Sequence, residues 1–381
     1  MKNFVSARTR TSLRLTAALT AVVLLTVSHS HLEAQAQESW SSAGPSGHAP
    51  IGIMGDHTHG AGEWMFAYMY QRVTISGLRD GTSSVSPDEA WMHYRMVPLS
   101  MEMDMHMPHV MYAPSDRVTL MVMTMWMRHG MEVRMDDGLM AGHSRGTAGD
   151  GHLAASPGHG NSEDHGGHGF HNMEHSLSGF ADTEVSALVT FFDRDRQRIH
   201  LNLGVGIPTG SITGTDDRMV PEHSRLGYPM QLGSGSWEAR PGITYLLQTD
   251  RVSWGSQGLG IFRVNENSEG WRRGHEGQFN GWAMLRGSDW ISPGLRLQAR
   301  HWGDVKGADP ALDPSVSPEN DPALQGGTRV NGFGALNFQV PSGPLAGHRL
   351  ALEIGAPVYE SLNGPQSSAD WTLNVGWEYS F

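Results

Sequence analysis

The chain has 381 residues, with 48 glycines, 22 methionines, 12 tryptophans and no cysteine. Without cysteine, an exported protein must obtain its stability from backbone pairing and packing rather than from disulfides. The formal net charge of -12 at pH 7 argues against nucleic acid or an anionic lipid surface as the partner.

The first 36 residues have the order of parts found in a secretory signal peptide. Basic side chains precede an apolar run over 15–27, and Ala34-Gln35-Ala36 supplies a small-x-small cleavage site. This run is shorter than the roughly 20 apolar residues that a membrane-spanning helix needs, so we favour cleavage over an uncleaved anchor. No later apolar run is long enough, which argues against a helical membrane protein. Residues 37–62 would then form a periplasmic N-terminal segment, a candidate plug, before a barrel over 63–381.

Segments of about ten residues along the rest of the chain alternate apolar and polar side chains. In the first of them, Trp64, Phe66 and Tyr68 share one parity. A tilted strand of this length can cross the hydrocarbon of a membrane, with one face toward lipid and the other toward the interior. The twelve candidate strands begin near Glu63, Met101, Arg117, Glu184, Arg198, Trp237, Val252, Phe279, Gly294, Arg329, His348 and Asp370.

The connections between these segments alternate in length. Short ones lie at 113–116, 193–196, 248–251, 288–293 and 341–347, and long ones at 76–99, 130–182, 209–235, 264–277, 303–327 and 359–369. Outer-membrane barrels have short periplasmic turns and long external loops, whereas a soluble β-sandwich has no reason to sort its loops by end. We therefore predict an all-β fold, a transmembrane antiparallel up-and-down β-barrel of about 12 strands with long external loops.

Two neighbouring strands are rich in methionine. In 101–111 the odd positions are mostly methionine, and the even positions include Glu102, Asp104 and His106. Because carboxylates cost more than methionine against lipid, we expect these polar residues to face the lumen and the methionines to face lipid. In the next strand the opposite assignment is favoured, which turns Met121, Met123, Met125 and Met127 inward. Their thioethers could bind copper(I) or silver(I); the alternative is that methionine is a flexible apolar filler.

The loop over 130–182 is rich in histidine and glycine. Its candidate metal ligands are His143, His152, His159, His165, His168, His171 and His175. Histidine-rich tracts can bind ions such as zinc or copper, because glycine lets the imidazoles converge. His48, His57 and His59 precede the first strand and add to this content. The alternative is a solvated surface loop.

Charged residues of both signs share the parity assigned to the lumen. The predicted lumen residues are Glu102, Asp104, His106, His200, Glu238, Arg240, Arg296, Arg300 and Glu353, with Arg349 and Glu378 on the same parity. They could line a polar solute path with a constriction, or form a paired network that holds the barrel shut.

The strings that could indicate an enzyme are weak. Residues 142–146 match Gly-x-Ser-x-Gly, but that motif needs a strand before it and a helix after it, and here it lies in the histidine-rich loop. We expect no enzymatic activity and no required cofactor; copper, silver or zinc ions are the candidate ligands.

The C-terminus alternates from Trp371 to Phe381, which is the last residue. Asn374, Gly376, Tyr379 and Phe381 resemble the terminal assembly signal of bacterial outer-membrane barrels. This resemblance implies the barrel assembly machinery and outer-membrane lipid as partners, in the outer membrane of a Gram-negative bacterium.

Two further blocks, 48–57 and 96–121, resemble the outer-membrane transporters grouped under the meta-pathway of phenol degradation. That resemblance implies an outer-membrane barrel that passes small molecules, with hydrophobic or aromatic compounds as the nominal substrate. The expected function is a transporter or channel for a small solute. The alternative is a surface-exposed His- and Met-rich protein that binds copper or other soft metal ions.

Overall fold

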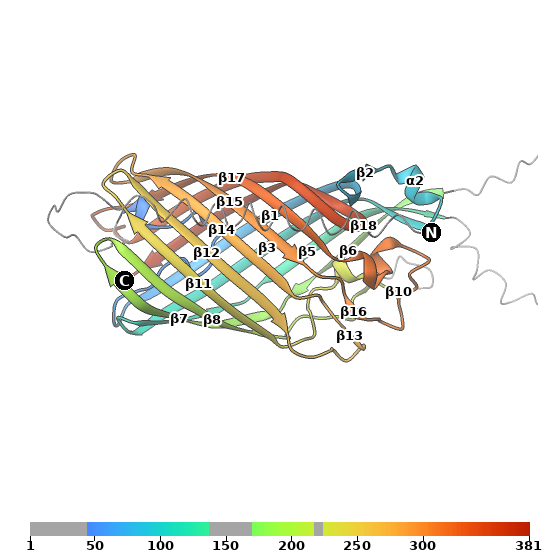
Figure 1. Cartoon of the computed structure of the whole chain (residues 1–381), viewed down its shortest axis with the longest axis horizontal. Helices are drawn as coiled ribbons and strands as arrows, with labels where there is room; N and C mark the ends of the chain where they lie inside the picture. The colour runs from blue at the N-terminus through green and yellow to red at the C-terminus, as the bar shows by residue number, and fades with distance from the viewer. Residues whose placement is uncertain (1–43, 137–169, 217–223) are drawn as a thin grey trace, which may run out of the picture. The chain divides into compact units, whose positions relative to one another are not determined.

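The structure is a computed structural model that describes residues 44–136, 170–216 and 224–381 (Figure 1). Within these residues, antiparallel strands close into a barrel, and three further strands extend the same sheet. The eleven ring strands are β1 (Trp64–Gly81), β3 (Met96–Ser115), β4 (Val118–Met123), β7 (Thr183–Arg194), β8 (Gln197–Ile207), β11 (Glu238–Gln248), β12 (Val252–Arg263), β14 (Glu276–Leu285), β15 (Ile291–Trp302), β17 (Gly327–Gln339) and β18 (His348–Ser380). The additional strands are β2 (Ser83–Val85), β5 (Trp126–Asp136) and β6 (Phe170–Phe180).

The ring is closed by the two ends of the described chain. β18 has 33 residues; its first part pairs with β17 and its last part with β1. At the end of this seam, the backbones of Trp64 and Phe381 exchange two hydrogen bonds, of 2.9 and 3.0 Å. The other side of β1 pairs with β3. Around the ring of described strands, closure leaves no free sheet edge, which is the condition for placing a sheet in hydrocarbon.

Short and long connections lie at opposite ends of the ring, here named the turn end and the loop end. β7 and β8 are joined at the turn end through Asp195 and Arg196, which have φ values of 51° and 65°. Such values match the twist of a two-residue hairpin. The loop end carries α2 (Pro87–Trp91), η2 (Tyr228–Met230), η3 (Pro318–Asn320), η4 (Pro322–Leu324) and two small sheets, β9 (Thr215–Asp216) with β10 (Ser224–Arg225) and β13 (Trp271–Arg272) with β16 (Lys306–Gly307). No helix in the described part of the chain is long and apolar enough to cross a membrane.

The two faces of the wall differ in chemistry, as the period of two requires. Exposed apolar side chains on the outer face include Leu203, Ile243, Leu295 and Leu352. Their chain neighbours His200, Asn202, Thr244, Arg296 and Glu353 are buried on the inner face. At the loop end, Ile212, Tyr228, Trp271, Val305 and Leu312 form an apolar cluster between the loops. Apolar side chains of these strands therefore face outward from the ring, and the polar side chains named here face its interior.

The prediction that Glu102, Asp104 and His106 face the lumen is wrong. All three lie on the outer face, where Glu102 pairs with Arg72 of β1. The Tyr70 hydroxyl donates to Asp104 at 2.5 Å, and the Tyr68 hydroxyl lies 2.6 Å from His106. Partners on the adjacent strand lower the cost of placing polar groups outside. Met101, Met105, Met107 and Met111, which were expected outside, are buried on the inner face.

Three predicted boundaries also change. β5 continues to Asp136 and β6 begins at Phe170, so both ends of the predicted histidine-rich loop are strand. The predicted loop at 359–369 lies within the continuous strand β18. Because β18 is counted once, the pairing pattern gives eleven ring strands where about twelve were predicted.

Candidate functional site

The residues before β1 cross the interior of the barrel. From here on, the N-terminal segment means residues 44–63, which are the described part of the predicted 37–62 segment together with Glu63; it begins with the short turn η1 (Pro45–Gly47). Asn337 of β17 directs its side-chain amide at the carbonyl oxygens of Pro45, His48 and Ala49, at 3.2–3.3 Å. Proline and glycine leave this stretch without regular structure, so its backbone groups need partners from the wall.

The backbone of Gly52 lies directly against the side chains of Glu353 and Arg296. Its N–H donates to Glu353 at 3.1 Å, and its carbonyl accepts from Arg296 at 3.3 Å. A Cβ atom at this position would lie 2.4 Å from the Glu353 carboxylate and 2.6 Å from the Arg296 guanidinium. Only glycine lets the backbone approach this ion pair so closely.

The opposite wall holds the next residues. Gln257 of β12 donates to the carbonyl of Met54 at 3.0 Å. On β8, His200 and Asn202 donate to the carbonyl of Gly55, at 2.9 and 3.1 Å. The N-terminal segment is therefore fixed by polar side chains that project inward from both sides of the ring.

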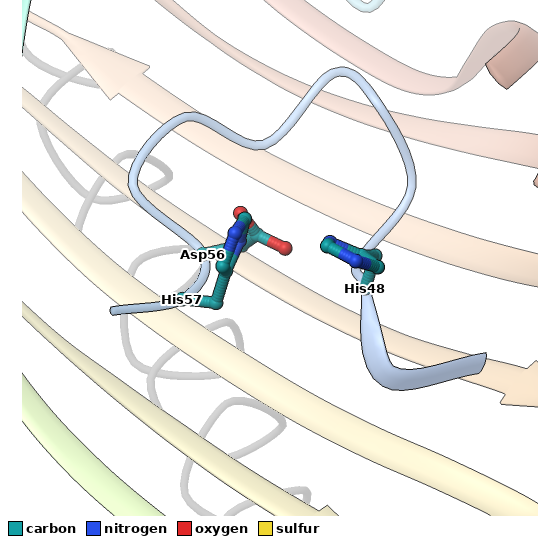
Figure 2. A group of neighbouring side chains, drawn as sticks. All are labelled: His48, Asp56 and His57. Atoms are coloured by element: carbon teal, nitrogen blue, oxygen red, sulfur yellow. The ribbon is translucent and has the colours of Figure 1, made fainter. Parts of the chain in front are cut away.

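Three histidines and one carboxylate gather where the segment turns back on itself. Figure 2 shows His48 facing Asp56 and His57 across this turn. One ligand atom from each of these three residues lies within 4.8 Å of the other two. The ring centroids of His57 and His59 are 4.8 Å apart. His48, Asp56, His57 and His59 are together named the histidine cluster.

Within this cluster, Asp56 is fully hydrogen-bonded, whereas several imidazole nitrogens have no partner. Asp56 accepts from His57 Nδ1 at 2.7 Å with one oxygen and from the Ala49 N–H at 2.9 Å with the other. Three buried ring nitrogens have no hydrogen-bond partner among the residues that the structure describes: His48 Nδ1, His57 Nε2 and His59 Nε2. A buried polar atom without a partner is costly, so this concentration needs an explanation.

Burial sets the electrostatics of the cluster. Burial lowers the pKa of His48 to about 3, with Arg349 and His57 acting in the same direction. Burial also lowers the pKa of His59 to about 3. Burial opposes the charge on Asp56, but His57 holds the pKa of that carboxyl below its usual range. In the same way, burial opposes the charge on His57, but Asp56 raises the pKa of its imidazole.

A cavity of about 430 Å³ borders the cluster at the turn end. Its lining includes His48, His57, His59, Arg198, Arg349 and Glu378. Arg349 donates to Glu378 at 2.5 Å and to the Ala49 carbonyl at 2.6 Å. The cluster therefore lies beside a space large enough for several water molecules.

The inner faces of β3, β4 and β5 carry facing methionines, here named the methionine wall. Directly opposite pairs across these strands are Met96 with Met135, Met101 with Met131, Met105 with Met127, and Met111 with Met121. All eight side chains are buried. His109 and His129 are buried on the same face, and each has at least one ring nitrogen with no partner within the described ranges. The wall thus offers thioethers and imidazoles side by side.

Inward charges nearer the loop end are paired. Arg240 contacts Glu238 at 2.7 Å and also pairs with Glu184. Arg300 contacts Glu276 at 2.8 Å. Beside them lies a second cavity, of about 230 Å³, whose lining includes Arg263, Arg273, Glu276, Arg300 and Trp302. The charged interior at this level is a network of partners.

The other predicted metal ligands are spread over the molecule. His143, His152, His159, His165 and His168 lie outside the described residues. His171 and His175 lie on β6, where His175 is 3.4 Å from Asp216. Met121 and Met127 are buried on the inner face, while Met123 and Met125 are partly buried and pack against the hydrophobic cluster that contains Met127.

Sequence reasoning noticed the early histidines but missed Asp56 and the way the cluster assembles. The available signal was the string Asp56-His57-Thr58-His59 ahead of the first strand. Two of the predicted assembly residues lie beside the N-terminal segment. Asn374 donates at 2.8 Å to Glu353, which also accepts from Gly52, and a Cβ on Gly376 would lie 2.3 Å from Ile51.

No family model matches the sequence, and no curated protein matches it. Among solved structures, an outer membrane channel from Pseudomonas putida F1 is 12% identical, covers 86% of this chain and 99% of its own, and has a TM-score of 0.54. A FadL homologue from Pseudomonas aeruginosa is 9% identical, with coverage of 84% and 90% and a TM-score of 0.39. The toluene transporter TodX of P. putida is 9% identical, with the same coverage and a TM-score of 0.37. Only the first comparison bears on the fold, which the two barrels share.

Proposed function

We propose that this chain, which shares its fold with an outer membrane channel, is a gated passage for a small solute across the outer membrane of a Gram-negative bacterium. In this proposal the N-terminal segment is the plug. The observation that carries it is the set of hydrogen bonds from opposite walls to the backbone of Met54, Gly55 and Gly52. These hydrogen bonds are made to main-chain atoms, so they fix the backbone position of the N-terminal segment and do not depend on its side chains.

The outer surface supports a membrane location. Exposed Leu203, Ile243, Leu295 and Leu352 belong to four strands around the ring, and such a face is stable only against lipid or another apolar partner. We also infer that the wall is crossed about twelve times. β4 and β5 are separated by two residues and together count as one crossing of the wall, and so do β6 and β7. β18 counts as two crossings, because its first part pairs with β17 and its last part with β1.

In this proposal passage requires movement of the N-terminal segment, because the described residues place it across the interior between opposite walls. The N-terminal segment crosses the ring toward the turn end, and the cluster around Trp271 packs the loops together at the other. Removal of the segment should therefore open the interior from one side. This expectation agrees with the resemblance to transporters noted from residues 48–57 and 96–121.

Single-channel recording in planar bilayers tests the proposal. The full-length barrel and a variant lacking 44–58 are compared, because this deletion removes the contacts from Asn337, Arg296 and His200. We expect small, infrequent currents for the full chain and larger, steady currents for the deletion. If neither protein conducts ions and neither takes up solutes in liposome swelling, the proposal is wrong.

The methionine wall favours a second candidate function, which is handling of soft monovalent cations. Thioethers are preferred ligands for copper(I) and silver(I), and facing pairs such as Met101 with Met131 place two of them on adjacent strands. The same wall is apolar and flexible, so it would also suit a hydrophobic solute. The two possible cargoes, a soft metal ion and a hydrophobic solute, can be told apart by measuring whether the methionine wall binds the ion.

Silver titration separates these cargoes. Met101→Leu/Met131→Leu keeps the wall apolar and removes two thioethers, and Met92→Leu, at a position that is 73% exposed, is the matched control. A soft-metal function predicts fewer bound silver ions for the double variant and no change for the control. Equal silver binding by all three proteins would leave only the apolar role of the wall.

A further inference from the structure

We propose that the histidine cluster binds one divalent transition-metal ion of the zinc or copper(II) class, with His48, His57 and Asp56 as ligands. The ion would join the two ends of the turn that the N-terminal segment makes inside the barrel. Binding itself does not depend on the barrel being a channel. Only the role of the ion in holding the plug rests on the proposed function.

The geometry of the cluster fits a metal ion. Ligand bonds of about 2.0–2.2 Å in a tetrahedral site place donor atoms roughly 3.3 Å apart. The donors of His48, Asp56 and His57 all lie within 4.8 Å of one another. A small closing movement would bring them to ligand distance. Such a movement is feasible because His48 and the Asp56–His57 pair lie on two arms of one short turn, with Gly52 and Gly55 between them.

The unpartnered nitrogens point to a missing ligand. His48 Nδ1 and His57 Nε2 are buried and have no hydrogen-bond partner in the described part of the chain. His57 Nδ1 donates to Asp56 at 2.7 Å, so an ion bound by both residues would take the place of that proton, whereas His48 Nδ1 has no partner to give up. The ion would accept electron pairs from His48, His57 and the Asp56 carboxylate, and the proton displaced from His57 would leave to solvent.

The surroundings of the ligands resemble the supporting contacts of known metal sites. The second oxygen of Asp56 accepts from the Ala49 N–H at 2.9 Å, which fixes the carboxylate. His59 has Nδ1 3.5 Å from Glu63, so its Nε2 remains available as a fourth donor beside His57. Carboxylates that orient metal-binding imidazoles in this way are a common second layer of such sites. The adjoining cavity could supply water instead.

The donor set selects the class of ion. Imidazole nitrogen and carboxylate oxygen suit zinc and copper(II), whereas copper(I) and silver(I) prefer thioethers. The methionine wall and the histidine cluster are therefore different sites with different ions. Because the ion would link His48 to Asp56 and His57, it would stabilise the turn that presents Gly52 to Glu353 and Gly55 to His200.

The test is metal binding by the full-length barrel, refolded in detergent without a polyhistidine tag. Cobalt(II) serves as the spectroscopic probe and zinc(II) as the competitor. The wild type is compared with His48→Gln/His57→Gln and with His93→Gln, which removes an exposed histidine on the loop side. All three chains keep the histidine-rich loop, so its contribution cancels in the comparison.

We expect the wild type and His93→Gln to bind one more equivalent of cobalt than the double variant, with visible bands of a nitrogen- and oxygen-ligated ion that zinc abolishes. Equal stoichiometry and identical spectra for all three would overturn the proposal. Heat modifiability on gels checks that each variant is folded. Should the double variant misfold, Asp56→Asn replaces it, and unchanged cobalt affinity in that variant counts against the site.

This result is independent of conduction. A barrel that binds the extra ion but never conducts would refute the channel and leave the metal site. A barrel that conducts without binding it would refute the site alone.

Discussion

Arg296 of β15 and Glu353 of β18 meet in two hydrogen bonds, of 2.6 and 3.0 Å, with both side chains fully buried. Arg296 also lies 4.0 Å from the centre of the Phe333 ring and donates to Asn280 at 3.0 Å. Glu353 accepts from Gly52 and Asn374 with its second oxygen. Through these contacts the pair connects four strands of the wall, β14, β15, β17 and β18, to the backbone of the N-terminal segment.

Removing one partner of this pair should destabilise the barrel strongly. Arg296→Met leaves the Glu353 carboxylate buried without its counter-ion, and we expect a loss of about 3–5 kcal/mol in the free energy of unfolding. Arg296→Met/Glu353→Leu should cost less than Arg296→Met, because no buried charge remains. Denaturant unfolding in detergent, followed by tryptophan fluorescence, gives both values. A smaller loss in the single variant than in the double one would contradict this account.

Gly52→Ala should displace the N-terminal segment while leaving the ring intact. The new Cβ would overlap the Glu353 carboxylate and the Arg296 guanidinium, at 2.4 and 2.6 Å. We expect faster proteolysis within 44–63 and higher conductance, with unchanged heat modifiability. Gly44→Ala is the control, since no atom lies within 4 Å of a Cβ there. Equal behaviour of the two variants would show that Gly52 is not a close contact.

Glu319 should make the loop end sensitive to pH. Burial raises the pKa of this carboxyl from 4.5 to about 8, so the folded protein keeps it protonated near neutrality. Between these values the unfolded chain has lost the proton, so the stabilisation present at acid pH declines as the pH rises through 8. After division by the intrinsic base-catalysed rate, the hydrogen-exchange protection of 303–327 should fall over this range, and Glu319→Gln should abolish that fall. Equal loss of protection in the wild type and in Glu319→Gln would refute the prediction.

Loss of Phe381 should impair closure of the barrel. Its ring stacks on Phe66 and Tyr379, at 5.9 and 5.2 Å, and its backbone exchanges two hydrogen bonds with Trp64. We expect a chain ending at Ser380 to yield less heat-modifiable barrel in the cell envelope. Leu345→Ala, at an exposed position in the β17–β18 turn, serves for comparison. A normal yield of the truncated chain would argue against an assembly role.

The wall could be predicted because a period of two is local. Alternation such as Trp371, Leu373 and Val375 specifies two faces without reference to the rest of the chain. The same rule failed for Glu102 and Asp104. Their energies depend on Arg72 and Tyr70 of the neighbouring strand, which sequence position does not place beside them.

The interior could be predicted only in part. The parity of Arg296 and Glu353 placed them inward, but their contacts with Gly52 join residues 244 and 301 positions apart. An irregular segment has no period from which such contacts could be derived. The pairing of Asp56 with His57 is adjacent in sequence, yet the approach of His48 depends on the turn between them.

The location of the seam sets an order for biogenesis. β1, which directly follows the N-terminal segment, gains its second neighbour only when the C-terminal part of β18 arrives. Gly376 in that part passes so close to Ile51 that no side chain would fit between them. Before this step the N-terminal segment could enter the half-formed sheet from the side. Afterwards it would have to be threaded through one end of the closed ring, so closure of the ring and insertion of the N-terminal segment should occur together.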